Sequence, residues 1–264
     1  MKSIRCGSGL GDSLYLQGVV RHLVEQGHGL EVCSDWPDVF LPLEGKVKVS
    51  PFRRDVDIKA HYAIRKGVRG TDQFQDVCIA AGIRGEVDFR LDWRVHNTAL
   101  VEKVRKGSRP VVAVLLPRQP FARGDGYGIE LLPRQHGMQR VVDMLGTRLV
   151  MLGSGDAKYP ISGIDLNLAN DTSVRDLIDV ASVVDGFVGY VSFFVPLAES
   201  LKKPALFVWA RAGLESQHEF IQRITPEKIF HRDTSRAITD DCSEQETLDA
   251  VDKFLDEIAG RGKV

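Results

Sequence analysis

Hydrophobic and polar residues alternate along the chain in two ways. Short apolar runs are typical of buried strands, and apolar residues three or four positions apart are typical of amphipathic helices. The first 35 residues contain both patterns: strands are expected at 3–6 and 30–34, separated by a glycine-rich turn and a helix that ends at Gly27. This order of strand, turn, helix and strand predicts half of a doubly wound parallel sheet.

The alternation is weaker between residues 46 and 106 and returns after Arg109-Pro110, where the proline interrupts the chain. In the weaker region we expect a strand at 56–60 and helices at 73–81 and 98–106. After Pro110 we expect strands at 111–116, 149–152, 186–189, 205–209 and 228–231, and helices at 135–145, 174–184, 195–201 and 243–259. Alternation of this kind predicts a second parallel sheet with right-handed crossovers.

The two regular regions predict an α/β protein with two Rossmann-like domains. We place the first domain at residues 1–108 and the second at 109–242, followed by a C-terminal helix and tail at 243–264. A chain of this length is long enough for each domain to bury a core of its own.

Composition excludes disorder and fibrous structure, and charge becomes informative once it is divided along the chain. The 264 residues are 43% hydrophobic and 27% charged, with a formal net charge of -1. Residues 46–106 contain 14 basic and 8 acidic side chains, a local charge of +6, whereas residues 233–259 carry a charge of −7. The basic region is compatible with an ordinary solvated surface, and equally with an anionic partner such as a phosphorylated sugar or a nucleic-acid backbone.

Cysteine usage and the hydrophobic pattern indicate a cytoplasmic protein. The four cysteines are scattered, with no Cys-x-x-Cys pair and no histidine at metal-ligand spacing, so we expect buried, reduced thiols. The N-terminus lacks the apolar segment of a signal peptide, and no stretch approaches the roughly 18 uninterrupted apolar residues of a spanning helix. We therefore expect no transmembrane segment, and any membrane contact would be peripheral.

The first candidate for chemistry is the turn from Gly7 to Ser13. Glycines let a ligand approach the backbone, and the free N–H groups at the start of the following helix attract anions. As a dinucleotide fingerprint the turn is incomplete because Asp12 stands where the third glycine belongs, yet Asp35 lies where an NAD ribose needs a carboxylate. An NAD-dependent dehydrogenase is therefore one alternative. Asp12 is either the cap of the helix or a base that faces an acceptor hydroxyl.

The second candidate is the segment 187–204, where a strand ends in a turn and the next helix carries Pro196 in its first turn. Unpaired N–H groups at the carboxyl end of a parallel sheet suit a diphosphate. Taken alone, the segment is equally compatible with an ordinary strand-to-helix turn.

Three segments together resemble glycosyltransferase family 9, the lipopolysaccharide heptosyltransferases. Residues 9–13, Gly-Leu-Gly-Asp-Ser, are similar to the family's opening Gly-x-Gly-Asp turn. Residues 149–155 and 167–177 are similar to a strand, turn and helix of the family, and residues 187–204 to its donor-binding turn. The resemblance implies the GT-B architecture, with two facing Rossmann-like domains and a C-terminal helix that packs back on the first domain. This chain would be a compact and divergent relative.

The donor-binding turn departs from the family's pattern of Asn-Asp-Ser/Thr-Gly-Pro-x-His. Residues 190–196 are Tyr-Val-Ser-Phe-Phe-Val-Pro, so Val191, Phe193 and Pro196 replace the aspartate, the glycine and the histidine. These replacements leave a non-catalytic sugar-nucleotide-binding module as an alternative to an enzyme.

The resemblance implies an inverting glycosyltransferase that moves a sugar from a nucleotide-sugar donor to a hydroxyl of an anionic acceptor, such as a lipopolysaccharide-core-like glycan. Asp12 corresponds to the family's base, which takes the proton of the acceptor hydroxyl as its oxygen attacks the anomeric carbon. Basic residues and oriented N–H groups would stabilise the departing diphosphate. The donor-binding candidates are Gly9, Gly11, Arg118, Arg123, Gly153, Gly189, Ser192, Phe193, Phe194 and Glu199. Glu199 is either a ribose ligand or an ordinary solvated residue of the helix.

On the acceptor side, His61 and Tyr62, with Arg65 and Lys66, follow the strand at 56–60 and would face the cleft between the domains. His61 is a second catalytic candidate, and the other three are acceptor-binding candidates. No Asp-x-Asp stands beside a glycine-rich donor turn, which fits transfer without a metal or a cofactor. A virus-type enzyme that glycosylates hydroxymethylated bases in DNA is an alternative that the compact size and the basic region allow.

Overall fold

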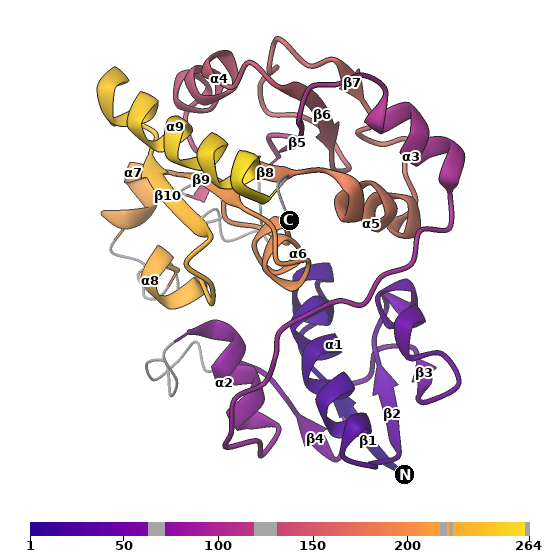
Figure 1. Cartoon of the computed structure of the whole chain (residues 1–264). Helices are drawn as coiled ribbons and strands as arrows, with labels where there is room; N and C mark the ends of the chain where they lie inside the picture. The colour runs from indigo at the N-terminus through magenta and orange to yellow at the C-terminus, as the bar shows by residue number, and fades with distance from the viewer. Residues whose placement is uncertain (63–71, 119–130, 217–220, 222–223, 262–264) are drawn as a thin grey trace.

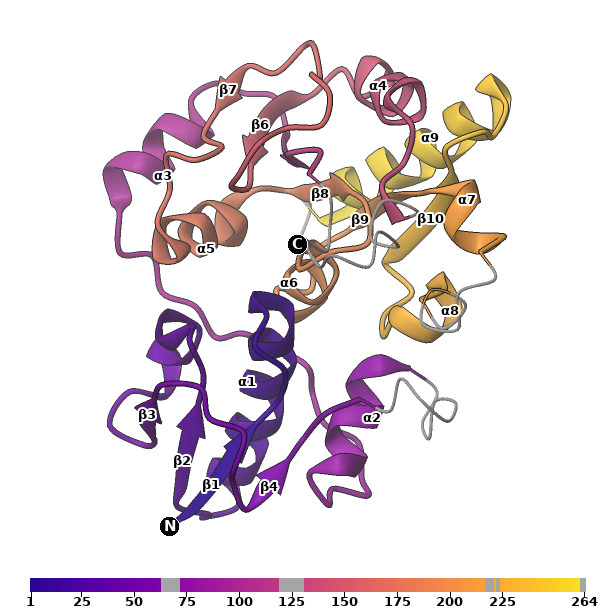
Figure 2. The ribbon, with the colours of Figure 1, turned by 180° about the vertical axis from the view of Figure 1, so that it is seen from behind.

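The computed structural model describes residues 1–62, 72–118, 131–216, 221 and 224–261. Figure 1 shows two parallel sheets, one above the other, with α1 (Leu10–Glu25) and α6 (Phe194–Ser200) between them. Figure 2 shows the same arrangement from behind. The α/β class predicted from the sequence is confirmed.

The first sheet has the strand order β3-β2-β1-β4, and all of its strands are parallel. Ile4 pairs with Val32 on one side and with Ile58 on the other, so apolar residues of three strands lie next to one another. The strand β3 is absent from the sequence predictions because its three residues include a lysine and a serine. This half contains β1 (Lys2–Arg5), β2 (Leu30–Cys33), η1 (Pro37–Leu43), β3 (Lys48–Ser50), β4 (Ile58–Lys59) and α2 (Gln73–Ala80).

The second sheet has the strand order β10-β9-β8-β5-β6-β7 and is also parallel. All five residues of β5 are buried, as its uninterrupted apolar run predicts. The strands are β5 (Val111–Leu115), β6 (Arg148–Leu152), β7 (Leu166–Asn167), β8 (Gly186–Gly189), β9 (Ala205–Trp209) and β10 (Ser235–Thr239). The helices of this half are α3 (Thr98–Arg105), α4 (Gln135–Met144), α5 (Val174–Val183), α6, α7 (Arg211–Leu214), α8 (Pro226–Ile229) and α9 (Glu244–Arg261).

The predicted strand at 228–231 is wrong. Pro226 begins the short helix α8 in that place, because its fixed backbone angle suits the first turn of a helix. The last strand is β10, which lies further along the chain and pairs with β9 over its whole length. Its sequence, Ser-Arg-Ala-Ile-Thr, is too polar to stand out as a strand.

The expectation that the C-terminal helix packs back on the first half is also wrong. Helix α9 lies along α4, β9 and β10 of the second half, as Figure 1 shows at its upper left. The reason is a matching surface: a Cβ at Gly186 would lie 2.7 Å from Phe254 Cζ and 2.9 Å from Ile258 Cδ1. The missing side chain in β8 therefore leaves the space that the apolar side of α9 fills.

Residues 86–97, here called the connecting segment, carry the chain from the first sheet to the second. The main-chain N–H of Leu91 donates to the carbonyl of Ser200 at 2.8 Å. Asp179 of α5, which has no exposed surface, accepts bonds from the Trp93 indole N–H at 2.6 Å and the Asn97 main-chain N–H at 2.7 Å. The segment is thus hydrogen-bonded to α5 and α6, and α3, which follows it, packs on α5.

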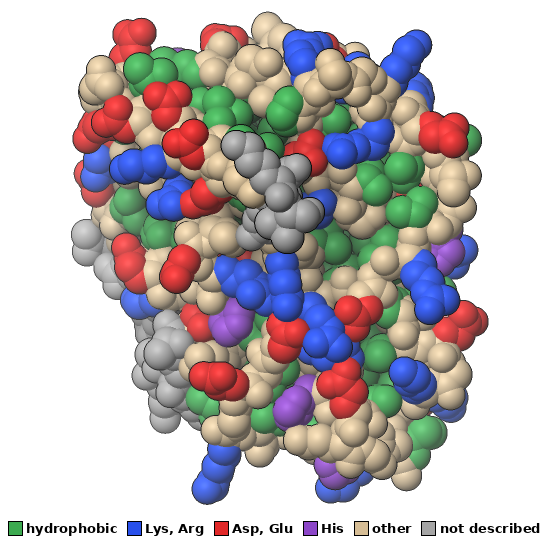
Figure 3. Space-filling model, in the orientation of Figure 1, with side chains coloured by type: hydrophobic (Ala, Val, Ile, Leu, Met, Phe, Trp, Pro, Cys, Tyr) green, Lys and Arg blue, Asp and Glu red, His purple; other side chains and the backbone are tan. Residues whose placement is uncertain are grey.

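Figure 3 views the face along which the connecting segment runs, and Lys, Arg, Asp and Glu side chains gather across its middle. Asp88 of the segment pairs there with Arg90 at 2.8 Å, Lys202 at 3.0 Å and Arg232 at 3.5 Å. Single exposed ion pairs contribute little, but a network around one carboxylate helps to hold the segment in place.

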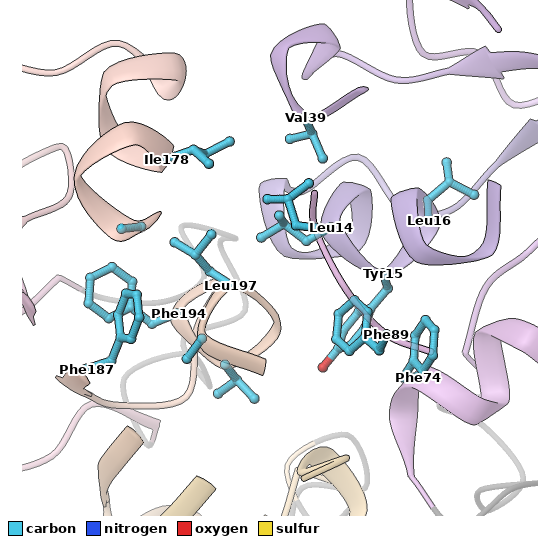
Figure 4. Packing of buried hydrophobic residues seen from close by; sticks show 14 of the residues in the cluster. Leu14, Tyr15, Leu16, Val39, Phe74, Phe89, Ile178, Phe187, Phe194 and Leu197 are labelled. Carbon is cyan, nitrogen blue, oxygen red and sulfur yellow. The ribbon is translucent and has the colours of Figure 1, made fainter. Parts of the chain in front are cut away.

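One hydrophobic cluster spans both sheets. Figure 4 shows Leu14 of α1 and Val39 of η1 opposite Ile178 of α5 and Leu197 of α6. All four are at most 1% exposed. The contact between the halves is therefore a packed apolar core at the level of α1 and α6.

Candidate functional site

The carboxylate of Asp12 lies directly over the glycine-rich turn at the carboxyl end of β1. Its Oδ2 accepts the main-chain N–H of Gly9 at 3.0 Å, which closes the first turn of α1. A Cβ at Gly7 would lie 2.2 Å from the same oxygen, and one at Gly9 would lie 3.0 Å from it. Glycine is thus required at both positions, because the Asp12 carboxylate of the same turn occupies the space that a side chain would need. A dinucleotide pyrophosphate approaching this backbone would meet that carboxylate, which disfavours the dehydrogenase alternative.

Asp35 is also engaged, since its Oδ1 accepts the main-chain N–H of Phe52 at 3.1 Å. This bond ties the end of β2 to the loop after β3. In a dehydrogenase this carboxylate would bind the ribose of NAD, whereas here it is engaged in a structural hydrogen bond.

Of the predicted acceptor-side residues, Tyr62 lies beside Asp12 and His61 lies against Tyr62. Burial, the negative charge of Asp12 and a hydrogen bond to Asp12 together hold the pKa of the Tyr62 hydroxyl well above its usual range. His61 stacks on Tyr62 with 4.6 Å between ring centroids, and its Nδ1 lies 2.8 Å from the carbonyl oxygen of Tyr62. The structure therefore places Tyr62 beside Asp12, with His61 behind it.

Fully buried Cys6 adds to this apolar surrounding. Burial and the nearby charge of Asp12 raise the pKa of its thiol. The thiol is therefore neutral and acts as a small apolar group under the turn. The predicted candidates Arg65, Lys66 and Arg123 lie outside the described residues.

The start of α1 touches the start of α6. A Cβ at Gly11 would lie 3.4 Å from the Cα of Phe193 and 3.4 Å from the Cγ of Pro196. Phe193 and Pro196 are two of the residues that depart from the family's donor-binding turn. Their apolar side chains fill the space between the start of α1 and the start of α6. A ligand that binds between these two helix starts therefore has to lie beside Phe193 and Pro196.

Ser192 caps α6. Its Oγ accepts the main-chain N–H of Phe194 at 3.1 Å, and the N–H of Val195 bonds to its carbonyl at 3.2 Å. The main-chain N–H of Phe194, a predicted phosphate donor, is therefore already occupied. A Cβ at Gly189 would lie 3.1 Å from Leu115 Cβ, which makes close packing of β8 on β5 the reason for that glycine.

Arg118 lies over a second glycine-rich loop, at the carboxyl ends of β5 and β6. Its Nη1 donates to the carbonyl of Ser154 at 2.8 Å. A Cβ at Gly155, where φ is +97°, would lie 3.1 Å from both Cδ and Nε of Arg118. Gly153, a predicted donor-binding residue, has φ +130° and packs its backbone on Leu116. Arg118 is exposed at this edge, where a diphosphate would reach it.

Two residues that the sequence predictions did not select hold Arg118 and its loop. The side-chain Oδ1 of Asn170 accepts the N–H of Gly155 at 2.6 Å, and the hydroxyl of Tyr190 accepts the main-chain N–H of Arg118 at 2.8 Å. Asn170 and Tyr190 lie in the segments that resemble the family. Nothing in the sequence shows that both reach the neighbourhood of Arg118.

Glu199 is fully buried in α6, away from the exposed edge. Its Oε1 accepts the main-chain N–H of His231 at 2.9 Å and the hydroxyl of Ser235 at 3.0 Å, whereas its Oε2 has no partner among the described residues. Burial raises the pKa of Glu199 to about 7. These bonds fasten the segment before β10 to α6, and a ribose would have to displace one of them.

His231 links the two halves. Its Nδ1 lies 3.0 Å from Oδ2 of Asp72, the residue that caps α2, and its ring lies edge-on to Phe74 with 5.0 Å between centroids. This partly buried Asp–His pair was not predicted, because 159 positions separate the two residues.

Three solved structures of glycosyltransferases are similar to this chain. A family 9 glycosyltransferase from Veillonella parvula has a TM-score of 0.64 and 10% identity, with 97% of each chain covered. The E. coli ADP-heptose lipopolysaccharide heptosyltransferase II has a TM-score of 0.58 and 14% identity over 97% of this chain and 98% of that one. The iron-containing dodecameric glycosyltransferase TibC of enterotoxigenic E. coli has a TM-score of 0.62 and 14% identity over 98% of this chain and 78% of that one.

The chain has the heptosyltransferase fold. No protein-family model and no curated protein sequence matches it. The likeness is therefore one of fold, and it agrees with the resemblance noted in the three sequence segments. On this fold the Asp12 turn and the Arg118 loop lie at the carboxyl edges of the first and the second sheet.

Within the described ranges, no three His, Cys, Asp or Glu side chains come together in a way that could hold a metal ion. In the same part of the chain, none of the helices combines the length and the apolar character needed to cross a membrane.

Proposed function

We propose that this protein is an inverting glycosyltransferase that moves a sugar from a nucleotide-sugar donor to a hydroxyl of an anionic glycan. The observation that carries the proposal is the pair of opposite charges at the two sheet edges. Asp12 is held over the turn after β1, and Arg118 is held over the loop after β6. A base for the acceptor and a cation for the leaving group are the two charges that this reaction needs.

In the proposed reaction, Asp12 takes the proton of the acceptor hydroxyl while its oxygen forms a bond to the anomeric carbon. The bond from that carbon to the diphosphate breaks at the same time, and the electron pair leaves with the β-phosphate. Arg118 stabilises this charge, since a guanidinium binds phosphate oxygens through two parallel N–H groups. The neutral Tyr62 hydroxyl next to Asp12 helps to hold the carboxylate in position.

The finer features of the proposal follow from the same scheme. The chain would act as two GT-B lobes, residues 1–108 and 109–242, with a cytoplasmic location and no metal or cofactor. No metal is needed in this scheme, because Asp12 supplies the base and Arg118 supplies the cation for the leaving group. A lipopolysaccharide-core-like sugar is the acceptor that the fold relatives suggest.

A non-catalytic sugar-nucleotide-binding module is the second candidate, and one observation favours it. Phe193 and Pro196 close the space beside Gly11, at positions where the family has a glycine and a histidine. If this contact keeps the sugar away from Asp12, the protein binds a nucleotide sugar at Arg118 without transferring it.

Profiling against nucleotide sugars tests both candidates. ADP-sugars come first in the panel because heptosyltransferase II of E. coli is named for ADP-heptose, and UDP- and GDP-sugars follow. If the protein is an enzyme, it releases the nucleoside diphosphate from at least one donor. If it is a binding module, a donor raises its stability against unfolding but no diphosphate is released. Stabilisation is about 2.7 kcal/mol at a ligand concentration of 100 Kd. Stabilisation by NAD and by none of ADP, UDP and GDP would overturn the proposal.

A further inference from the structure

Tyr190 stands at the carboxyl end of β8, and its hydroxyl reaches the segment after β5. The hydroxyl accepts the main-chain N–H of Arg118 at 2.8 Å. It lies 2.5 Å from the carbonyl oxygen of Arg118 and 3.0 Å from that of Leu116, either of which accepts its proton. Burial raises the pKa of Tyr190 to about 12. The hydroxyl is therefore protonated at neutral pH and can donate and accept together.

The backbone just before Arg118 is held by a neighbouring strand and loop. The N–H of Leu116 bonds to the carbonyl of Leu152 at 2.8 Å, and the N–H of Lys158 bonds to the carbonyl of Pro117 at 2.7 Å. At Arg118 itself, both main-chain polar groups turn to the Tyr190 hydroxyl. Tyr190 thus fixes the point from which the arginine side chain leaves the backbone.

The far end of the Arg118 side chain is fixed from the other side. Nη1 bonds to the carbonyl of Ser154, and the aliphatic part and Nε lie against Gly155. Asn170, at φ +67°, holds this loop through Gly155 N–H at 2.6 Å and through its own N–H to Gly153 at 2.9 Å. Among the described residues, Nε and Nη2 of Arg118 make no hydrogen bond to the protein, so these N–H groups remain available to a ligand.

We propose that Tyr190 is a positioning residue for the donor diphosphate, acting through Arg118. The inference rests on the proposed function, because it takes Arg118 as the residue that binds the diphosphate. A guanidinium that is fixed at its backbone and at Nη1 loses little side-chain entropy when it binds phosphate. Tyr190 occupies the first position of the turn whose sequence departs from the family, so this arrangement belongs to the turn found in this chain.

A double-mutant cycle on the full-length protein tests the inference. Binding of pyrophosphate, ADP, UDP and GDP is measured by calorimetry, and the nucleotide that binds best is compared with its nucleoside. We expect Tyr190→Phe to weaken diphosphate binding about fivefold, the effect of one lost hydrogen bond, and to leave nucleoside binding unchanged. Arg118→Gln should weaken it about 10- to 100-fold. The double variant should bind like Arg118→Gln alone, because Tyr190 acts through the arginine.

Tyr159→Phe is the matched control. Tyr159 is a partly buried tyrosine of the second half, but its hydroxyl donates to the carbonyl of Pro133 at 2.7 Å and not to Arg118. It should retain wild-type diphosphate affinity. Hydrogen exchange of the Arg118 amide gives a reading without any nucleotide: it should become faster in Tyr190→Phe and stay unchanged in Tyr159→Phe.

The outcomes separate the two proposals. If Tyr190→Phe and Arg118→Gln weaken binding independently, or if Tyr190→Phe weakens nucleoside binding equally, Tyr190 is only structural and the inference is overturned. If the wild-type protein binds neither pyrophosphate nor any of the three nucleotides, the proposed function fails and takes the inference with it. An unchanged Arg118 amide in Tyr190→Phe also contradicts the inference, whatever the protein binds.

Discussion

At the edge of the first sheet the glycines leave room for a carboxylate, and at the edge of the second sheet they leave room for a guanidinium. Asp12 comes from the same turn as Gly7 and Gly9, and its contacts are set by the local path of the backbone. Arg118 comes from the loop after a different strand than Gly155 and depends on Tyr190 and Asn170 for its place. The first site is therefore local, and the second is built by tertiary contacts.

The largest effect is expected at the local site. Asp12→Asn keeps the shape of the side chain and removes the base, so sugar transfer should fall by about 10²- to 10⁴-fold. Nucleotide affinity should be unchanged, because it depends on the other edge. Steady-state transfer assays and calorimetry on the same preparation check both statements, and undiminished turnover would remove Asp12 from the mechanism.

Glu199 provides a contrast with Asp12, since it is a carboxylate of the second half without exposed surface. Its pKa is raised from 4.5 to about 7. As pH rises from about 4.5 to 7, the unfolded chain releases this proton before the folded protein does, so folding stability falls across that window. The loss amounts to roughly 3 kcal/mol in the free energy of unfolding. Because a glutamine does not titrate, we expect the Glu199→Gln variant to avoid this loss and to be more stable than the wild type at pH 8.

Urea unfolding at pH 4, 6 and 8 measures this difference. The two proteins should be close in stability at pH 4, where both the folded and the unfolded wild type carry the proton. The other titratable groups near Glu199, chiefly His231 and Asp72, are common to both proteins. Parallel pH profiles for the wild type and Glu199→Gln would contradict the raised pKa.

Gly7→Ala tests whether the glycine serves the carboxylate. The new Cβ would meet Asp12 Oδ2 at 2.2 Å, so the carboxylate has to move although it is still present. A displacement of about 1 Å can cost on the order of 10²-fold in rate. Gly29→Ala is the control, because a Cβ there meets nothing within 4 Å and φ is ordinary. Transfer rates that are equal in the two variants would show that the turn tolerates a displaced Asp12.

The smallest effect is expected at the second loop. Gly155 and Gly107 both have positive φ, +97° and +112°, so alanine should cost each roughly 1–2 kcal/mol of stability. Only Gly155 touches Arg118. Gly155→Ala should therefore also weaken diphosphate binding by a few fold, whereas Gly107→Ala should not. Equal diphosphate affinities in calorimetry would separate the loop from the function of Arg118.

Features that depend on local contacts could be predicted from the sequence, whereas features that depend on tertiary contacts could not. The all-apolar run of β5 and the glycine-rich turn with Asp12 are local features, and both were predicted in the right place. The periodicity of α9 predicts a buried side with Leu248, Val251, Phe254, Leu255 and Ile258; Val251, Phe254 and Ile258 are buried, whereas Leu255 is half-buried and Leu248 is exposed. Periodicity does not say which surface a helix covers, and the space over Gly186 decides that.

The same limit applies to the site. Glu199 was predicted as a ribose ligand, but its partners His231 and Ser235 lie more than 30 positions further along the chain. Arg118 was predicted as a donor-binding residue, whereas Tyr190 and Asn170 could not be connected to it without the order of the strands β8, β5 and β6. Contacts between loops of neighbouring strands follow from that order and not from the spacing in the sequence.

The bonds between Asp179 and the connecting segment have a consequence for cooperativity. A buried carboxylate that holds the chain as it passes from one sheet to the other, together with a shared hydrophobic cluster, couples the unfolding of the two halves. Calorimetry should therefore record one melting transition for the wild-type chain. Without these bonds, as in Asp179→Ala, only the shared cluster couples the halves, so the transition is expected to broaden and to move to a lower temperature.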